Sequence, residues 1–457
     1  MKNILLITLV LFISNNLFAG NIRDKIKKID WNGIEVVWIE DNRFPTYDII
    51  LYFADGALSD GNYAKGETSA MFSMLGNGTR RFSQKDLADH LEYFGTSYSP
   101  YITHEFSMYS ISGLVKDVMP TMKMICHMFK DASFSKSEIR KEKKLWKNRL
   151  QNLISNQGAL AGRVFRELSL KGSPYYYPVG GKLSDIKNIN QKGLIRKRDY
   201  FNKKVKKRIY ITGPKKALDI KQIITQDCEW AGAKSQRVRT MNYKPIQEKA
   251  QAEIFLITVP KSNQAQVRIG KFLNKGEFDN PATMNLSTGF LGGGFTSKLM
   301  REVRVKRGLT YSIGAFAAGQ REYGRSGIST STPNEKINEL LQVINETLAG
   351  AVRGEVSDEE LERARGYLLG SHSFQFEESS SLLQQLVKID HEQRSYDDLF
   401  NFTEKVSMVN KDQVVKMIDQ YFNWNKQTIV ILGTKSLAKK LSKNGLRVNI
   451  VNYKKFL

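Results

Sequence analysis

The chain has 457 residues, 41% of them hydrophobic, with 70 Lys and Arg against 46 Asp and Glu and a formal net charge of +24. This composition supports sizeable cores and excludes a mainly disordered chain, and the length corresponds to two large domains or about three average ones. The one conspicuous apolar run, residues 4–13, is too short to cross a bilayer, so a polytopic membrane protein is excluded.

The first residues have the layout of a secretory signal peptide. Lys2 supplies a positive start, residues 4–13 form an apolar core, and a short polar segment ends at the small residue Ala19. Removal of residues 1–19 would start the mature chain near Gly20 and predicts a periplasmic location. The alternative is an N-terminal membrane anchor, which would need a longer apolar run.

The excess of basic residues does not indicate a nucleic-acid partner. The two densest stretches, residues 136–149 and 192–208, are interleaved with helix-forming or strand-forming residues and match no nucleic-acid-binding module. We interpret them as solvated faces. Contact with acidic peptides or with an anionic membrane surface stays open as a secondary role.

The first half of the chain reads as strands followed by helices. The clearest element is an amphipathic helix over residues 83–94, which Ser83 can cap and Gly95 ends. The other expected elements, in chain order, are strands at 33–40 and 47–53, a helix from about 66 to 76, a strand at 107–113, helices at 118–129 and 137–154, and a helical segment 185–202 before a strand at 207–213.

A similar order recurs in the second half. Strands at 254–259 and 265–271 precede helices at 282–291 and about 297–307, and a helix at 410–422 leads into a strand at 428–433. We therefore predict an α+β protein of two similar domains, each a mainly antiparallel sheet packed with helices. Their expected bounds are residues 20–232 and 251–457, joined by a polar linker at 233–250.

Four stretches together carry a family resemblance. They are LGGGFTSKLMREVRVKRGLTYSIGA at residues 291–315, LADHLEYFGTSYSPYITHEFSMYSISGL at 87–114, SPYYYPVGG at 173–181 and SDEELERARGYLLG at 357–370. In this order they resemble the M16 peptidases (the pitrilysin, insulinase and mitochondrial processing peptidase family), especially the bacterial two-domain type. The resemblance implies two M16-type domains and a peptide substrate.

The zinc motif of catalytic M16 members is degenerate in this chain. In those members an H-x-x-E-H helix provides two zinc-ligating histidines and a general base, and a distal Glu completes the ligands. In register, Ser69 and Ser73 stand at the histidine positions, Phe72 at the Glu, and Arg149 at the distal Glu. The resemblance thus implies no metal site and no catalytic residue here.

No other histidine pattern rescues the site. The five histidines of the chain include no pair three or four residues apart. His104 and Glu105 look like the start of an H-E-x-x-H motif, but Met108 occupies the last position and the stretch reads as a strand. The two cysteines, Cys126 and Cys228, are too far apart in sequence for a zinc ribbon, and whether they pair is left open.

The resemblance retains the substrate-binding half of the active site. By that resemblance Arg304 and Tyr311 hold the substrate backbone, and Arg307 is a nearby second candidate; read without it, Arg304 is a solvated helix residue and Tyr311 a packing residue. Three interpretations remain for Gly292, Gly293 and Gly294. They are a phosphate cradle, which lacks the P-loop ending, a tight turn at a helix entry, or a glycine-rich loop that lines the peptide chamber.

The expected function is that of a zinc-free subunit in an exported heterodimer. The partner, a second M16 chain, would contribute the zinc, and this chain would contribute Arg304 and Tyr311 to a shared site that binds an extended peptide. The alternative is a periplasmic polypeptide-binding or scaffold protein with the M16 fold and no part in proteolysis.

Overall fold

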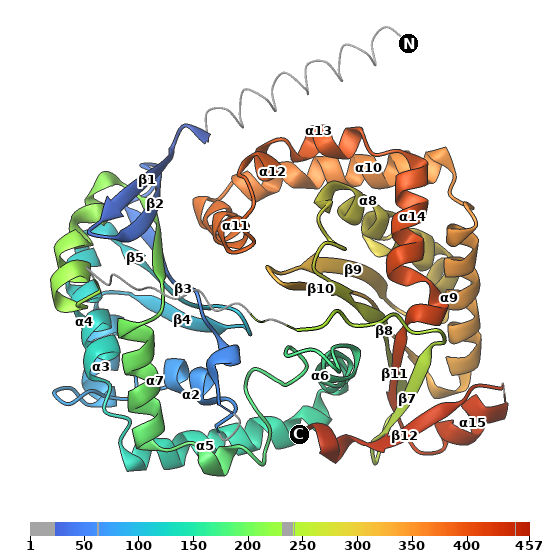
Figure 1. Cartoon of the computed structure of the whole chain (residues 1–457), viewed down its shortest axis with the longest axis horizontal. Helices are drawn as coiled ribbons and strands as arrows, with labels where there is room; N and C mark the ends of the chain where they lie inside the picture. Colours follow the sequence, from blue (N-terminus) through green and yellow to red (C-terminus); the bar gives the residue numbers. More distant parts are fainter. Residues whose placement is uncertain (1–22, 62–63, 231–240, 242, 444) are drawn as a thin grey trace, which may run out of the picture. The chain divides into compact units, whose positions relative to one another are not determined.

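The computed structural model describes residues 23–61, 64–230, 241, 243–443 and 445–457 (Figure 1). The expected signal peptide, residues 1–19, and the first part of the expected linker lie outside these ranges. Within them, the strands form two six-stranded sheets, each accompanied by helices. The α+β class with two similar domains is confirmed. None of the helices in the described ranges is both long and apolar enough to cross a membrane.

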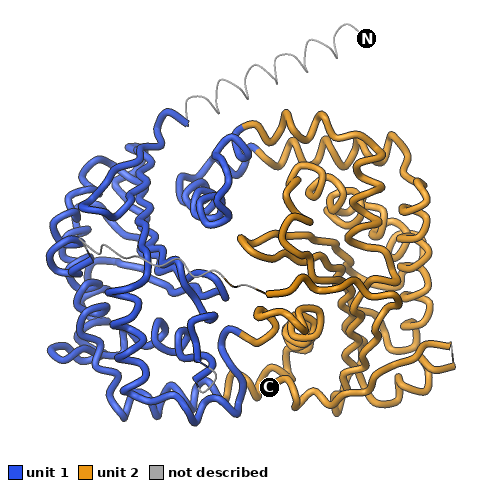
Figure 2. The backbone as a smooth tube through the Cα atoms, in the orientation of Figure 1, with its two compact units in different colours: residues 1–147, 179–240, 373–400 blue, residues 148–178, 241–372, 401–457 orange. Residues whose placement is uncertain are grey.

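The first sheet belongs to unit 1, which comprises residues 1–147, 179–240 and 373–400 (Figure 2). Its strand order is β1-β2-β6-β3-β5-β4, and β2 and β6 form its one parallel pair among the described strands. The strands are β1 (Ile26–Trp31), β2 (Ile34–Glu40), β3 (Thr46–Phe53), β4 (Ser97–Ile102), β5 (Ser107–Leu114) and β6 (Lys207–Gly213). The helices of this unit include α2 (Glu67–Ser73), α3 (Gln84–Tyr93), α4 (Val118–Asp131), α7 (Gln191–Lys203), α11 (Ser379–His391) and α12 (Asp397–Phe400).

The second sheet belongs to unit 2, residues 148–178, 241–372 and 401–457. Its strand order is β12-β7-β11-β8-β10-β9. The five strands from β7 to β9 in this order correspond to the five strands from β2 to β4 in the order of the first sheet. The strands are β7 (Glu253–Thr258), β8 (Gln264–Asn274), β9 (Ile313–Gly319), β10 (Tyr323–Pro333), β11 (Thr428–Gly433) and β12 (Val448–Asn452). The helices are α6 (Gln157–Ser169), α8 (Pro281–Gly292), α9 (Ile337–Val352), α10 (Asp358–His372), α13 (Phe402–Ser407), α14 (Lys411–Phe422) and α15 (Leu437–Lys443), while α5 (Lys136–Gln151) crosses the boundary between the units.

Each unit contains a segment from the other half of the sequence (Figure 2). Helix α6, from the first half, belongs to unit 2, where Gly158 lies beside Arg268 of β8. Helix α11, from the second half, belongs to unit 1, where Leu383 and Leu386 join the apolar cluster around Tyr210 of β6. The sequence predicts two domains divided at a single linker. The compact units differ from this division because each includes one of these two segments.

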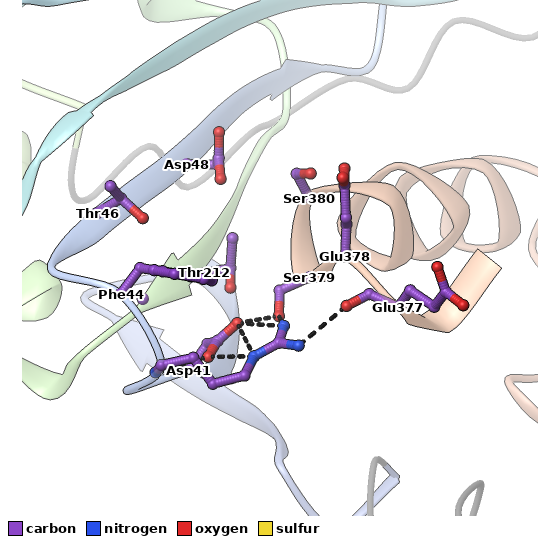
Figure 3. A pocket seen from close by; sticks show the side chains of 11 residues that line it. Asp41, Phe44, Thr46, Asp48, Thr212, Glu377, Glu378, Ser379 and Ser380 are labelled. Carbon is purple, nitrogen blue, oxygen red and sulfur yellow. Dashed lines mark hydrogen bonds and ion pairs between the residues drawn. The ribbon is translucent and has the colours of Figure 1, made fainter. Parts of the chain in front are cut away.

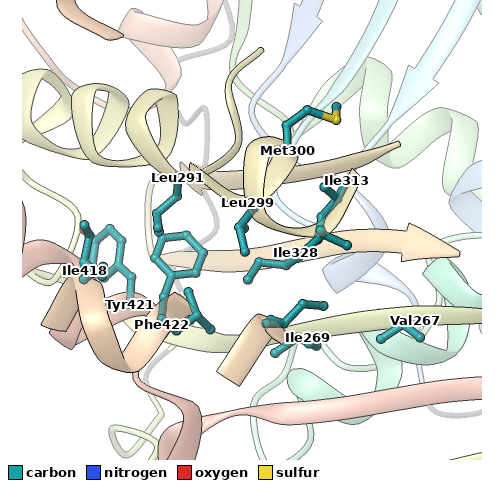
Figure 4. Close-up of a cluster of buried hydrophobic side chains, with 14 of the residues drawn as sticks. Val267, Ile269, Leu291, Leu299, Met300, Ile313, Ile328, Ile418, Tyr421 and Phe422 are labelled. Carbon is teal, nitrogen blue, oxygen red and sulfur yellow. The ribbon is translucent and has the colours of Figure 1, made fainter. Parts of the chain in front are cut away.

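Both faces of the first sheet are covered at its centre, which explains the unbroken apolar run of β3. Leu51 and Phe53 face one way, and Phe53 packs against Phe129 of α4 and Phe201 of α7. Ile50 and Tyr52 face the other way, against α11. Because successive side chains of a strand point to opposite faces, a strand buried on both needs apolar residues throughout. In unit 2 the equivalent core forms between the sheet and helices α8, α9 and α14 (Figure 4).

A buried lysine couples the stability of unit 1 to pH. Burial lowers the pKa of Lys207, which begins β6, to about 7 from the ordinary 10.5. Because the folded state holds this proton less tightly than the unfolded state, the contribution of Lys207 to stability rises from pH 7 towards pH 10.5. We expect the stability of the wild type relative to Lys207→Met to rise by about 1 kcal/mol per pH unit above pH 7, measured by urea unfolding at pH 7, 8 and 9. An unchanged difference would contradict this.

Candidate functional site

Helix α2 is the helix that the resemblance places at the zinc motif, and it has serines at both histidine positions of that motif. Its N-cap is Gly66, at φ 84°, a left-handed conformation that glycine adopts without strain. Ser69 is half-buried and Ser73 is exposed, whereas Phe72 is buried. A serine hydroxyl is a poor zinc ligand beside imidazole or carboxylate. The residues at these positions do not fit a zinc ion.

Phe72 belongs to an aromatic core. Its ring lies 5.4 Å from that of Phe53, 5.0 Å from Phe201 and 6.2 Å from Phe129, all in edge-to-face geometry. Such pairs contribute beyond the area that they bury. At the position where the resemblance places the general base, this chain therefore has Phe72, which packs against β3, α4 and α7.

The other positions around the degenerate motif add no ligand set. Arg149, at the distal Glu position, is exposed near the end of α5. His104 and Glu105 lie between β4 and β5, and the carboxylate of Glu105 accepts a hydrogen bond from Nε2 of His391 of α11 at 3.0 Å. Within the described ranges, no group of three or more His, Cys, Asp or Glu residues is placed to hold a metal ion.

Arg304 in unit 2 differs from the basic residues around it. It lies in a short helical turn, Met300–Val305, where the main chain widens to i+5 hydrogen bonding. Arg301 pairs with Glu360, and Arg307 donates to Glu302 at 3.2 Å. Among the described residues Arg304 makes no ion pair, and its guanidinium carbon lies 5.3 Å from the ring centre of Phe295. The stacking leaves the guanidinium donors available to a ligand.

The second candidate, Arg307, is bound within the protein. It donates to the carbonyl of Glu302 at 2.8 Å as well as to its carboxylate. Burial works to raise the pKa of Glu302, but hydrogen bonds from Lys306 and Arg307 outweigh it, and the pKa is lowered. Glu302 thus stays ionised and holds Arg307. The geometry favours Arg304 as the substrate-binding residue, because its guanidinium is not held by a carboxylate of the described residues.

Tyr311 is open to solvent. Its side chain is 85% exposed, two residues before β9, and Gly308, at φ 58°, provides the left-handed turn between the Arg304 segment and Tyr311. A phenol with no buried packing role is a free hydrogen-bond donor. Arg304, which is half-buried, and Tyr311, which is exposed, are thus two hydrogen-bond donors on one short segment of unit 2.

Sequence reasoning missed an apolar surface beside these donors. Phe295 is 76% exposed under Arg304, Val305 is 69% exposed, and Tyr367 of α10 is 61% exposed beside Gly294. Exposed large apolar side chains that gather in one place indicate an interaction surface. The signal was present, since Phe295 follows the triple glycine and Tyr367 lies in the stretch 357–370, but exposure depends on the fold.

The triple glycine ends α8 and enters a tight turn. A Cβ on Gly292 would come 2.2 Å from the amide nitrogen of Ala315 in β9, and one on Gly293 would come 2.6 Å from Gly289. These two glycines therefore satisfy close packing, as the tight-turn interpretation expects. Gly294 has only Tyr367 near it, at 3.9 Å, and its role in peptide binding stays a prediction.

The Gly292 contact can be tested by substitution. We expect Gly292→Ala to lower the free energy of unfolding by about 2 kcal/mol, because a methyl group against backbone forces α8 and β9 apart. Gly294→Ala, which meets only Tyr367, is the matched control and should change stability by less than about 0.5 kcal/mol. Urea unfolding monitored by circular dichroism measures both. Equal stability of the two variants would contradict the packing argument.

Comparison with known proteins identifies relatives along most of the chain. The family model described as "Insulinase (Peptidase family M16)" matches residues 35–173, and that described as "Peptidase M16 inactive domain" matches residues 214–368. An uncharacterized zinc protease of Streptomyces coelicolor is 22% identical over 76% of this chain and 76% of its own length. An uncharacterized zinc protease of Bacillus subtilis is 21% identical over 86% of this chain and 94% of its own.

Solved structures share the fold. The M16 inactive domain from Pseudomonas fluorescens superposes with a TM-score of 0.79 at 21% identity, covering 90% of this chain and 98% of its own. The periplasmic protease PqqL from Escherichia coli gives a TM-score of 0.70 at 13% identity and covers 90% of this chain but 46% of its own length. These similarities show the fold.

Proposed function

This chain belongs to the M16 peptidase family, and we propose that it is the non-catalytic, substrate-binding subunit of a heterodimeric M16 metallopeptidase in the cell envelope. One contrast within the chain carries the proposal. Helix α2 has Ser69, Phe72 and Ser73 where zinc chemistry needs His, Glu and His, whereas the half-buried Arg304 makes no ion pair with the described residues and Tyr311 is exposed. Zinc would be bound by the partner subunit.

The donors suit a peptide backbone. A guanidinium and a phenol can both hydrogen-bond a peptide carbonyl oxygen and stabilise negative charge that develops on it. The apolar surface formed by Phe295, Val305 and Tyr367 would contact substrate side chains next to them. These groups act on substrate without a metal in this chain.

Unit 1 offers an edge for an extended peptide. Strand β4 is the last strand of the first sheet, most of its residues are exposed, and Tyr98 of β4 lies beside Gly76 after α2. An extended chain can add to such an edge through main-chain hydrogen bonds. Pro100 lacks an N–H group, so a peptide would bond to β4 on either side of it.

Mixing experiments test the shared active site. Three samples are compared. They are this chain alone, an M16 chain from the same organism that has an intact H-x-x-E-H motif, and the mixture of the two. We expect cleavage of an unfolded polypeptide by the mixture and little by either chain alone, with zinc found in the partner only. Full activity of the partner alone would rule the proposal out, as would stoichiometric zinc and hydrolysis in this chain alone.

Substitution of Arg304 tests its role. We expect Arg304→Ala to lower kcat/KM of the mixed complex about 100-fold, equivalent to about 2.7 kcal/mol, because a preorganised donor to the developing oxyanion is lost. Arg307→Ala, whose guanidinium is bound to Glu302, should change it less than about threefold. Steady-state kinetics with a fluorogenic peptide measures both. Equal effects of the two substitutions on kcat/KM would show that Arg304 has no specific role in binding the substrate.

A binding or scaffold protein without a role in proteolysis is the second candidate. The apolar surface formed by Phe295, Val305 and Tyr367 favours it as well, because a surface of this kind can retain polypeptides without cutting them. Under this function the mixture would bind unfolded polypeptide but cleave it no faster than the partner does alone. The mixing experiment therefore separates the two functions.

A further inference from the structure

Unit 1 contains an acidic cavity of about 260 Å³ that the functions above do not use (Figure 3). It lies between the start of β3, the end of β6 and the N-terminus of α11, and its lining includes Asp41, Arg43, Asp48, Thr212, Glu378 and Ser379. With Glu377, the lining has four carboxylates and one guanidinium. This negative cavity belongs to a chain whose formal net charge is +24.

One of these carboxylates is already neutralised. The guanidinium of Arg43 donates to both oxygens of Asp41, and it also donates to the carbonyl of Glu377 and the hydroxyl of Ser379 (Figure 3). Hydrogen bonds from Arg43 hold the pKa of Asp41 well below its ordinary value. The donors of Arg43 are thus directed at groups of the protein, and an incoming anion would have to displace them.

Asp48 is different. Its side chain is half-buried on β3 and makes no hydrogen bond or ion pair with the described residues. Burial, and then the nearby Glu378, raise the pKa of Asp48. Two carboxylates that face one cavity without a counter-ion repel each other, and a cation between them would relieve both that repulsion and the cost of burial.

A buried hydroxyl adds an independent observation. Thr212 of β6 is 3% exposed, and its oxygen has no hydrogen-bond partner among the described residues. Thr212 pairs with Asp48 of the neighbouring strand β3, so both side chains lie on the same face of the sheet. The side chain of Thr212 is among those that line the cavity (Figure 3). A buried polar group without a partner costs free energy, which a ligand with an N–H donor would recover.

A polar row connects this cavity with the free edge of the sheet. Asp48 pairs in register with Thr212 on one side and Ser112 on the other, and Ser112 pairs with Ser97 of β4. A second cavity, of about 190 Å³, extends along this row and shares Asp48 and Ser380 with the first. The acidic cavity therefore adjoins a second cavity that is lined by Ser97, Tyr98 and Ser99 of β4, the strand at which a peptide is proposed to bind.

We propose that the cavity at Asp48 and Thr212 binds a cationic nitrogen group of a polypeptide, either a Lys side chain or the N-terminal ammonium. An ammonium supplies the positive charge that Asp48 and Glu378 lack and the N–H donor that Thr212 lacks. A metal ion fits less well, because no group of three or more His, Cys, Asp or Glu residues in the described ranges is placed to hold one. The inference rests on the proposed peptide-binding function and specifies its ligand.

Matched peptides test the site on the isolated chain. One acetylated and amidated twelve-residue peptide contains a single Lys, a second has norleucine in its place, and a third has norleucine and a free N-terminal amine. Calorimetry at low salt should show the first or the third peptide binding about tenfold more tightly than the second. Which of the two gains affinity identifies the source of the cation.

Variants locate the effect. Asp48→Asn should reduce the tenfold preference to less than twofold, and Thr212→Val should reduce it about threefold, while Asp89→Asn, on the exposed part of α3, should leave it unchanged. Both site variants should fold at least as stably as the wild type, because Asp48→Asn removes a half-buried charge and Thr212→Val removes a buried hydroxyl that has no partner among the described residues. No preference for either cation, or a preference retained in Asp48→Asn, would overturn the inference. Cleavage by the mixed subunits is measured separately, so the proposed function can survive that result.

Discussion

Loss of the bond between Cys126 and Cys228 is expected to lower the free energy of unfolding of unit 1 by about 4 kcal/mol. The structure pairs these buried cysteines, with 4.7 Å between their Cα atoms and a sequence separation of 102 positions. The bond joins α4 to the segment after β6, so it closes a loop that contains α5, α6, α7 and one strand of the first sheet, β6. A crosslink across about 100 residues removes much conformational freedom from the unfolded chain.

The measurement is urea unfolding of the oxidised chain, of the chain with dithiothreitol, and of the double variant Cys126→Ser/Cys228→Ser. Reduced wild type and double variant should unfold at the same lower midpoint, and dithiothreitol should not affect the variant. If the reductant left the wild-type midpoint unchanged, the bond would contribute nothing. The disulfide also supports the proposal of export, because such bonds persist in oxidising compartments.

Rebuilding the zinc motif is expected to unfold unit 1 instead of restoring a metal site. The variant Ser69→His/Phe72→Glu/Ser73→His carries the full H-x-x-E-H pattern. Phe72, however, packs on three aromatic rings and is 1% exposed, so a glutamate there would bury a charge in an apolar core. We expect a loss of at least about 4 kcal/mol, similar to or larger than that of Phe72→Ala.

The double variant Ser69→His/Ser73→His is the matched control. Ser73 is exposed and Ser69 half-buried, so this change should cost less than about 1 kcal/mol. Thermal unfolding and metal analysis of all three proteins decide the matter. A folded triple variant that binds one zinc per chain would contradict this expectation and show that the core around Phe72 can rearrange.

Local sequence patterns predicted the elements that are determined by residues within a single segment. The helix expected at residues 83–94 is α3, and Ser83 caps it with a reciprocal bond to Asp86. The strand expected at 47–53 is β3. Strand β4 was missed because Ser97, Ser99 and Pro100 have low strand propensity; its pairing with β5 imposes the extended conformation.

The sequence by itself determined the family, the α+β class, the repeat of two similar domains and the absence of zinc-motif residues, because each depends on residue identity in a short window. Only the tertiary structure decided the exchange of α6 and α11 between the units, the pairing of the cysteines, and which of Arg304 and Arg307 is bound to Glu302. It alone also brought Asp48, Thr212 and Glu378 around one cavity. These features arise from contacts between residues tens to hundreds of positions apart, and the energies of such contacts leave no periodic pattern in the chain.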